Sequence, residues 1–283
     1  MFKLFKNPKL ALALTLAIVI PFIYYNLTNH KNKVLGETVA QMQQTPASSP
    51  SLLTTPTPAP SSSASPASKL SKSTYTIAVY GDSLVDTMGE RLEYLEKSLR
   101  AKYPGTDFKL YNYGIGGENV TKGLERFASA FSYQTRNYPP ITQINADVII
   151  LGSFSYNPFP NHDAQKHYSL LNNLIFRAKA TGAQVYLLAE IAPLENNFGD
   201  GPHGINWPPD LANLQAVHIV EQIQNVLSLA TSTNTPIINA YRESLMGSKF
   251  GNPTYINSDD GIHPSVQGHV LTANLIARNL KLN

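Results

Sequence analysis

The sequence contains no cysteine in its 283 residues. A chain without thiols forms no disulfides and carries out no cysteine chemistry, so any folded domain must rely on its apolar core. Charge is also sparse, since 14% of the residues are Asp, Glu, Lys or Arg while 42% are hydrophobic. This apolar content is sufficient for one sizeable domain with a core of its own.

The positive charge is unevenly distributed along the chain. The formal net charge is +3, but residues 1–72 hold 7 Lys and Arg against one acidic residue. The remaining 15 basic and 18 acidic residues give the rest of the chain a charge of about −3. A nucleic-acid-binding domain gathers basic residues on its folded surface. We therefore expect no nucleic-acid partner.

The N-terminal region combines lysines with a long apolar run. Leu10–Leu27 carries no charged residue and follows Lys3, Lys6 and Lys9. As a helix this run would be about 27 Å long, slightly short of a typical hydrocarbon core of ~30 Å. Because no A-x-A-like site follows directly, the run predicts an uncleaved membrane anchor over residues 1–30, with a cleaved signal peptide as the alternative. In both cases we expect the folded part to be exported.

A segment rich in Pro, Ser, Thr and Ala follows the apolar run. Residues 31–72 include "TTPTPAPSSSASPAS", which offers almost nothing apolar to bury. Such a composition does not offset the entropy of ordering, so we expect an extended tether that proline stiffens. The folded domain is then predicted over residues 73–283.

Short apolar runs alternate with amphipathic stretches throughout the predicted domain. Most of the runs are apolar on both faces, as in the strands of a covered parallel sheet. Parallel neighbours need crossover helices, so the pattern predicts a three-layer α/β/α sandwich with a five-stranded parallel sheet. The predicted strands are "TIAVY" (Thr76 to Tyr80), "FKLYNY" (Phe108 to Tyr113), "DVIILG" (Asp147 to Gly152), "QVYLLA" (Gln184 to Ala189) and "PIINA" (Pro236 to Ala240).

Four apolar stripes with helical spacing lie between or after these runs. Residues three or four positions apart share one face of a helix, so each stripe predicts a helix that packs on the sheet. The stripes are Val85, Met88, Leu92, Leu95 and Leu99; Leu170, Leu171, Leu174, Ile175 and Ala178; Ala216, Val220, Ile223, Leu227 and Ala230; and Val266, Val270, Ala273, Ala277 and Leu280.

Ser83 in "VYGDSLVDT" lies just past the end of the first predicted strand. In open parallel sheets, ligands bind beyond the carboxyl ends of the strands. A serine hydroxyl needs a base that removes its proton during attack, and that base needs a third group to hold it. His263 in "NSDDGIHPS" is the candidate base, because its loop is expected at the same edge. Asp260, three residues earlier, is the candidate partner of the imidazole.

The other six histidines are weaker candidates for this chemistry. His30 lies in the leader and His203 in a loop, whereas the remaining four lie on or beside predicted helices, where a satisfied or solvated histidine is usual. No H-E-x-x-H occurs, and His162 and His167 are five residues apart, so they do not stack on one helix face. There is also no P-loop or dinucleotide-binding fingerprint. We expect no metal and no cofactor.

Two motifs together resemble the GDSL or SGNH hydrolases. "GDSL" occupies residues 81–84 and D-x-x-H occupies residues 260–263, near opposite ends of one α/β domain. The resemblance spans roughly residues 74–283 and implies a flavodoxin-like sandwich that hydrolyses esters. It assigns the roles of nucleophile, acid partner and base to Ser83, Asp260 and His263. Either motif is weak alone, but their order and placement make the pair specific.

Of two further sequence blocks of that family, this sequence matches one and departs from the other. "NYGIGGENV" is similar to the glycine block, which implies that the backbone N–H groups of Gly117 and Ser83 bind the oxyanion. The third block, usually G-x-N-D, is degenerate here: "GSFSYNPF" has Phe154 at the asparagine position and Ser155 at the aspartate position. Asn157, three residues further on, is the candidate replacement for the missing amide donor.

The expected substrate is an ester, either a small molecule or a polysaccharide. The predicted export favours removal of O-acyl groups, acetyl above all, from cell-envelope or environmental carbohydrate. The loop Ala192–Asp210 is long and contains Phe198, His203 and Trp207, so it either covers the pocket and stacks on a sugar or is a plain surface loop. An acyltransferase, a lipase or thioesterase, and a non-catalytic glycan-binding module remain alternatives. The sequence predicts no oligomeric state.

Overall fold

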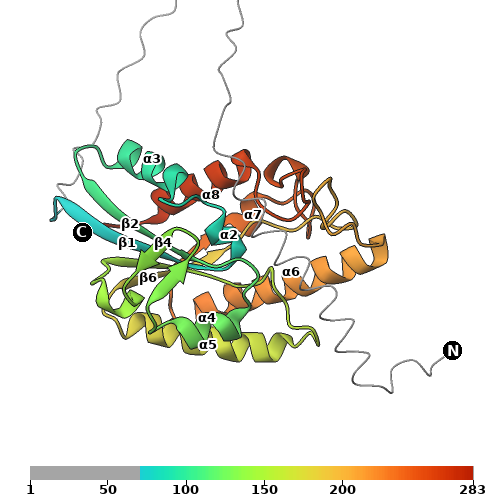
Figure 1. Ribbon diagram of the computed structural model, residues 1–283, viewed down its shortest axis with the longest axis horizontal. Coiled ribbons are helices and arrows are strands. Elements are labelled where there is room, and N and C mark those ends of the chain that lie inside the picture. The colour runs from blue at the N-terminus through green and yellow to red at the C-terminus, as the bar shows by residue number, and fades with distance from the viewer. Residues whose placement is uncertain (1–70, 283) are drawn as a thin grey trace, which may run out of the picture. The chain divides into compact units, whose positions relative to one another are not determined.

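The unbroken apolar runs of the sequence form a parallel sheet in the computed structural model, which describes residues 71–282 (Figure 1). The predicted anchor over residues 1–30 and nearly all of the predicted tether lie outside these described residues. Between residues 71 and 282, no helix has both the length and the hydropathy that a membrane span requires.

The main sheet has five strands in the order β2-β1-β5-β6-β7, and every neighbouring pair is parallel. All five predicted strands are confirmed, with ends that differ from the prediction by at most two residues. The order is that of flavodoxin-like sheets, and it places a reversal of strand order beside β1. The strands are β1 (Thr74–Gly81), β2 (Asp107–Gly114), β5 (Val148–Gly152), β6 (Gln184–Ala189) and β7 (Ile237–Asn239).

Helices cover both faces of this sheet, which confirms the predicted three-layer α/β/α sandwich. In Figure 1, α3 and α8 lie on one side of the strands, and α4, α5 and α6 lie on the other. The α-helices of the described chain are α2 (Ser83–Asp86), α3 (Glu93–Lys102), α4 (Val120–Arg126), α5 (Ala164–Lys179), α6 (Pro209–Ser232), α7 (Ala240–Glu243) and α8 (Val266–Asn279). Two 3₁₀ turns are η1 (Ile141–Gln143) and η2 (Pro253–Tyr255).

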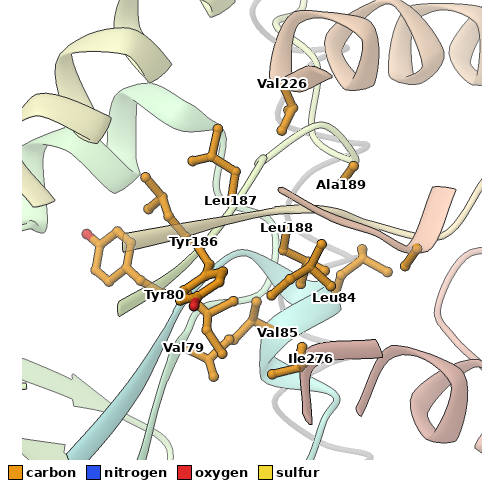
Figure 2. Packing of buried hydrophobic residues seen from close by; sticks show 14 of the residues in the cluster. Val79, Tyr80, Leu84, Val85, Tyr186, Leu187, Leu188, Ala189, Val226 and Ile276 are labelled. Carbon is orange, nitrogen blue, oxygen red and sulfur yellow. The ribbon is translucent and has the colours of Figure 1, made fainter. Parts of the chain in front are cut away.

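The core lies on both sides of the sheet. Figure 2 shows Val226 of α6 on one side of the strands, and Val85 of α2 and Ile276 of α8 on the other. Leu187 and Leu188, neighbours on β6, point to opposite faces, and both are buried. Strands buried on both faces need apolar residues at every position, which is why these strands read as continuous runs.

The stripe from Val85 to Leu99 forms two helices rather than one. Its five residues are all buried, as predicted, but α2 ends at Asp86 and α3 begins only at Glu93. Gly89 has φ +99° and Leu92 has φ +57°, so the backbone leaves the helical region at both positions. The periodicity therefore predicted burial correctly and helix continuity wrongly.

The predicted stripe of α8 is partly wrong. Val266 and Val270 are 59% and 41% exposed, although both were expected on the buried face. The buried face is rotated toward Thr272 and Ile276, while Ala273, Ala277 and Leu280 are buried as expected. The spacing alone did not separate two adjacent faces of one helix.

A small antiparallel hairpin was not predicted from the sequence. Its strands are β3 (Phe131–Tyr133) and β4 (Arg136–Tyr138), and Gln134 in the turn has φ +54°. Arg136 is 3% exposed, forms an ion pair with Asp86 of α2, and donates a 2.9 Å hydrogen bond to the Asn112 carbonyl. The hairpin is therefore tied to the helix that begins with Ser83.

Candidate active site

Ser83 is the first residue of α2, directly beyond the carboxyl end of β1. The preceding Asp82 caps the helix, because its Oδ1 accepts a 3.0 Å hydrogen bond from the Leu84 N–H. Gly81 allows a tight turn here: an added Cβ would lie 2.5 Å from Val85 Cγ2. Ser83 itself is 8% exposed, so the strand end and the helix hold it in a largely buried position.

The end of β2 fixes α2 against the sheet. Asn112, fully buried in β2, donates hydrogen bonds of 3.0 and 2.7 Å to the carbonyls of Val85 and Gly89. A Cβ on Gly114 would lie 2.3 Å from the Asp86 backbone nitrogen, so the helix packs directly on bare backbone. Sequence reasoning missed Asn112; its only signal is a polar residue in the apolar run "FKLYNY".

Asp260 and His263 form the predicted pair. Asp260 Oδ2 lies 2.8 Å from His263 Nδ1, and Oδ1 accepts hydrogen bonds of 2.9 and 2.8 Å from the backbone N–H groups of His263 and Ile262. Burial acts to raise the pKa of Asp260, but the hydrogen bonds and charge of His263 outweigh it and lower that pKa. The carboxylate therefore stays ionised and fixes the imidazole so that Nε2 is free to serve as a base.

The imidazole and the nucleophile segment share one neighbourhood. The charge of His263 is among the influences that lower the pKa of Asp82, the residue directly before Ser83. The two groups therefore lie close enough for their charges to interact, and both follow the carboxyl ends of parallel strands, β1 and β7. The structure thus brings residues from near both ends of the domain to the same edge of the sheet.

The glycine block forms the turn between β2 and α4. Gly117 has φ +76°, a conformation that favours glycine, and a Cβ there would meet no atom within 4 Å. The turn ends at Asn119, which caps α4 by accepting a 3.0 Å hydrogen bond from the Thr121 N–H. The space beside the Gly117 Cα is therefore open, and the role of its N–H as an oxyanion donor stays a prediction.

In the degenerate third block, Phe154 and Asn157 point in different directions. Phe154 has φ +57° and is fully buried, with its ring edge-on to Tyr80 at 5.9 Å. Asn157 instead turns toward the nucleophile segment, where its Nδ2 donates a 3.1 Å hydrogen bond to Asp82 Oδ2. An amide nitrogen carries two hydrogens, so the second N–H of Asn157 is available to another acceptor. Its role as an oxyanion donor stays a prediction.

Two buried carboxyl groups lie behind the nucleophile segment. Glu190 follows β6 and accepts a 2.7 Å hydrogen bond from the Ser153 N–H, while the Ser153 hydroxyl bonds to its other oxygen. Burial, with the nearby charge of Asp82, raises the pKa of Glu190 to about 8. Burial also raises the pKa of Asp82, but only to about 6, because Leu84, Asn157 and His263 oppose the rise. Of the two carboxyl groups, Glu190 therefore keeps its proton to the higher pH.

The remaining described histidines have other surroundings, and the expectation that those on helices are satisfied or solvated holds only in part, since the buried Nδ1 atoms of His162 and His269 have no hydrogen-bond partner. His167 is buried against the Ser153 carbonyl, 2.9 Å from its Nε2, and burial lowers its pKa to about 4. The rings of His162 and His218 stack at 3.9 Å. His269 stacks on Tyr94, and burial lowers its pKa to about 4.

The loop after β6 packs on the loop that carries Asp260 and His263. The Gly199 N–H donates a 3.1 Å hydrogen bond to the Gly261 carbonyl, and the His203 N–H donates one of 2.7 Å to the Asp259 carbonyl. A Cβ on Gly261, which has φ +66°, would lie 2.5 Å from the Asp200 carbonyl oxygen. The long loop therefore supports the acid–base pair from behind.

Two aromatic residues anchor this loop. Phe198 is 2% exposed and packs on Tyr156 and on Trp207, with ring centroids 6.2 Å apart in both pairs. Trp207 is partly exposed. Of the two aromatic residues considered for sugar stacking, only Trp207 keeps an accessible surface.

Comparison with known proteins identifies the family of this chain. The family model of GDSL-like lipases and acylhydrolases matches residues 77–276, which span Ser83, Gly117, Asn157, Asp260 and His263. The chain belongs to this family. It is therefore a hydrolase that acts on ester bonds. A search of curated protein sequences finds no match.

Solved structures of acylhydrolases share the fold of this GDSL acylhydrolase. An acetyl xylan esterase, AlAXEase, is 18% identical with a TM-score of 0.53, over 73% of this chain and all of the other. A lipase/acylhydrolase from Enterococcus faecalis is 19% identical with a TM-score of 0.52, over 74% and 98% of the two chains. The acetylxylan esterase Axe2 from Geobacillus stearothermophilus is 17% identical with a TM-score of 0.51, over 74% and 95%.

Proposed function

We propose that this GDSL acylhydrolase removes O-acetyl groups from carbohydrate, with Ser83 as the nucleophile. The observation that carries the proposal is the 2.8 Å contact between Asp260 Oδ2 and His263 Nδ1, in a loop whose imidazole lies near the nucleophile segment. It supplies an oriented base at the strand edge where Ser83 begins a helix.

The proposed reaction proceeds through an acyl-enzyme. Ser83 Oγ attacks the ester carbonyl while His263 Nε2 takes its proton, and the tetrahedral oxyanion is held by the N–H groups of Ser83 and Gly117 and the amide of Asn157. The C–O bond to the alcohol then breaks, and His263 returns the proton to the leaving oxygen. Water, deprotonated by His263, attacks the acyl-enzyme and releases the carboxylic acid and free Ser83.

Three observations support a carbohydrate ester as the substrate. Two structural neighbours are acetyl xylan esterases by name, although that describes those proteins. Trp207 offers a partly exposed ring in the loop that packs behind Asp260. The lysine-flanked apolar run, followed by a Pro-rich segment, supports an exported and membrane-tethered location where glycans are accessible.

Hydrolysis of acetyl esters by the full chain, with Ser83→Ala beside it, tests the proposal. The wild type is expected to release acetate from p-nitrophenyl acetate and from acetylated xylan, and Ser83→Ala is expected to lose at least about 10³-fold in kcat. Equal activity of the two proteins would exclude Ser83 as the nucleophile. Faster cleavage of long-chain p-nitrophenyl esters than of acetyl esters would instead indicate a lipid substrate.

Trp207→Ala tests the carbohydrate part separately. Loss of a stacking surface is expected to raise KM for acetylated xylan several-fold and to leave KM for p-nitrophenyl acetate unchanged, because the small ester does not reach the loop. Equal KM values for acetylated xylan in the wild type and in Trp207→Ala would show that Trp207 does not contribute to carbohydrate binding.

A further inference from the structure

Arg126, the last residue of α4, connects the two segments that are expected to bind the oxyanion. Its Nη2 donates a 2.9 Å hydrogen bond to the Gly81 carbonyl, and its Nε donates one of 2.5 Å to Glu118 Oε2. Gly81 lies two residues before Ser83, and Glu118 directly follows Gly117. One guanidinium group therefore holds chain neighbours of both backbone donors.

The surroundings of this contact limit its exposure to water. The side chains of Arg126 and Glu118 are 15% and 17% exposed. The guanidinium carbon lies 4.3 Å from the centroid of the Tyr80 ring, and the group borders a cavity of about 80 Å³ that is also lined by Phe127 and Phe131. An ion pair that is screened this little by water has a more sharply defined geometry than one on the surface.

A second ion pair on the same helix shows the contrast. Lys122 and Glu125 are also paired, at 2.8 Å, but their side chains are 63% and 57% exposed. Exposed pairs of this kind contribute little to stability and hold no distant segment in place. Arg126, in contrast, bonds to groups from β1 and from the turn after β2.

We propose that Arg126 is a positioning residue for the oxyanion hole, which sets the relative position of the Ser83 and Gly117 N–H groups. The inference rests on the proposed function, because it assumes that these two groups bind the oxyanion. A guanidinium suits the task because its donors have a fixed planar arrangement, whereas a lysine ammonium is a single point charge on a flexible chain.

Removal of Arg126 would affect both segments. The Gly81 carbonyl would lose its hydrogen bond from the guanidinium and keep the 3.2 Å one from the Ile115 N–H. Burial already acts to raise the pKa of Glu118, and Arg126 opposes that rise. Without the guanidinium, Glu118 would take up a proton or turn toward water, and Gly117 would move with it.

Steady-state kinetics of Arg126→Gln, Arg126→Lys and Arg126→Ala on p-nitrophenyl acetate test the proposal. Arg126→Gln is expected to lower kcat about 10²-fold, with KM within about twofold of the wild type, since oxyanion contacts act mainly in the transition state. Arg126→Lys is expected to fold and still to lose about tenfold in kcat. Guanidinium ions at millimolar concentration are expected to restore part of the kcat of Arg126→Ala, because the shortened side chain opens space beside the existing cavity.

Lys122→Gln, on the same helix, is the matched control and is expected to keep the wild-type kcat. A wild-type kcat in Arg126→Lys, or folded Arg126→Ala that guanidinium does not restore, would overturn the inference even if the other variants fail to fold. These outcomes are distinct from failure of the proposed function. In that case the wild type itself would show no turnover and no labelling of Ser83 by a fluorophosphonate.

Discussion

The nucleophile segment, residues 81–86, and the acid–base loop, residues 257–263, are held in place by different means. The nucleophile segment continues a central strand, and its short helix packs on bare backbone at Gly114 and is bonded by Asn112. The acid–base loop has no strand of the main sheet within it. It is fixed by its own hydrogen bonds around Asp260 and by the neighbouring loop at Gly261.

This difference separates two kinds of sensitivity. The position of Ser83 depends on the sheet and the core, so changes that displace the nucleophile segment also destabilise the domain. The position of His263 depends on local contacts between loops at the surface, so the imidazole can be misplaced while the core stays intact. Substitutions in the nucleophile segment should therefore lower activity and stability together. Substitutions in the acid–base loop should lower activity with little change in stability.

The largest effect on activity alone is expected from Asp260→Asn. The amide keeps an oxygen for the two backbone N–H groups but no longer fixes the imidazole in the orientation and tautomer that leave Nε2 free. We expect kcat to fall about 10³- to 10⁴-fold, while the midpoint of urea unfolding changes little. Asp210→Asn, at an exposed site, serves as the control. Retention of more than a tenth of the wild-type kcat would contradict the assigned role.

Alanine at Gly114 or Gly261 compares the two segments directly. At Gly114 the new Cβ would press on the Asp86 backbone, and we expect a loss of about 3 kcal/mol in the free energy of unfolding. At Gly261 the new Cβ would press on the Asp200 backbone. We expect kcat to fall there by a larger factor than the equilibrium constant of folding. Gly247→Ala, with φ +88° and open space around it, should cost only about 1 kcal/mol. Urea unfolding and kinetics on all three variants would measure both quantities. If Gly114→Ala and Gly261→Ala changed kcat and the free energy of unfolding by similar amounts, the proposed difference between the two segments would be wrong.

Asn157→Ala tests whether the displaced amide serves catalysis. If its second N–H binds the oxyanion, kcat falls about 10²-fold, and the free energy of unfolding falls by about 1 to 3 kcal/mol because the buried Asp82 carboxylate loses a hydrogen bond. Asn173→Ala, on the exposed face of α5, is the control. An unchanged kcat would leave the Ser83 and Gly117 N–H groups as the two proposed donors.

The smallest expected effect concerns pH and Glu190. Its folded-state pKa of about 8 exceeds its usual 4.5, so the folded state holds this proton more tightly and stability falls as pH rises between these values. The lowered pKa values of His167 and His269 act in the opposite direction only below 6.5. Between pH 6.5 and 8 the wild type should therefore lose about 1 to 2 kcal/mol that Glu190→Gln does not lose, measured by urea unfolding. A parallel decline in both proteins would contradict this assignment.

The sequence predicted the features that depend on local patterns. Unbroken apolar runs identified all five strands, because burial on both faces leaves a direct trace in composition. The pairing of Asp260 with His263 also follows from a local feature, a three-residue spacing in a loop with a glycine. The break between α2 and α3 was missed, because the stripe of apolar residues continues across Gly89 and because residue type does not predict the positive φ of Leu92.

The contacts that complete the site join residues far apart in the sequence. Asn157 reaches Asp82 across 75 positions, and Arg126 reaches Gly81 across 45. No periodicity or motif in a single sequence records which of many polar residues meet in this way. The hairpin β3–β4 was missed for a related reason, since "FSYQTRNY" is short and polar and is fixed mainly through Arg136.

The inward turn of Phe154 limits how this site can change. Its ring fills the interior beside Tyr80, and a Cβ on Gly123 would lie 2.5 Å from it. Exchanging this one residue for asparagine would leave a hole in the interior without delivering an amide to the reaction centre. A change to the usual third block would therefore need several substitutions in this segment together. Single substitutions would each destabilise the domain, so natural selection is expected to retain the present arrangement.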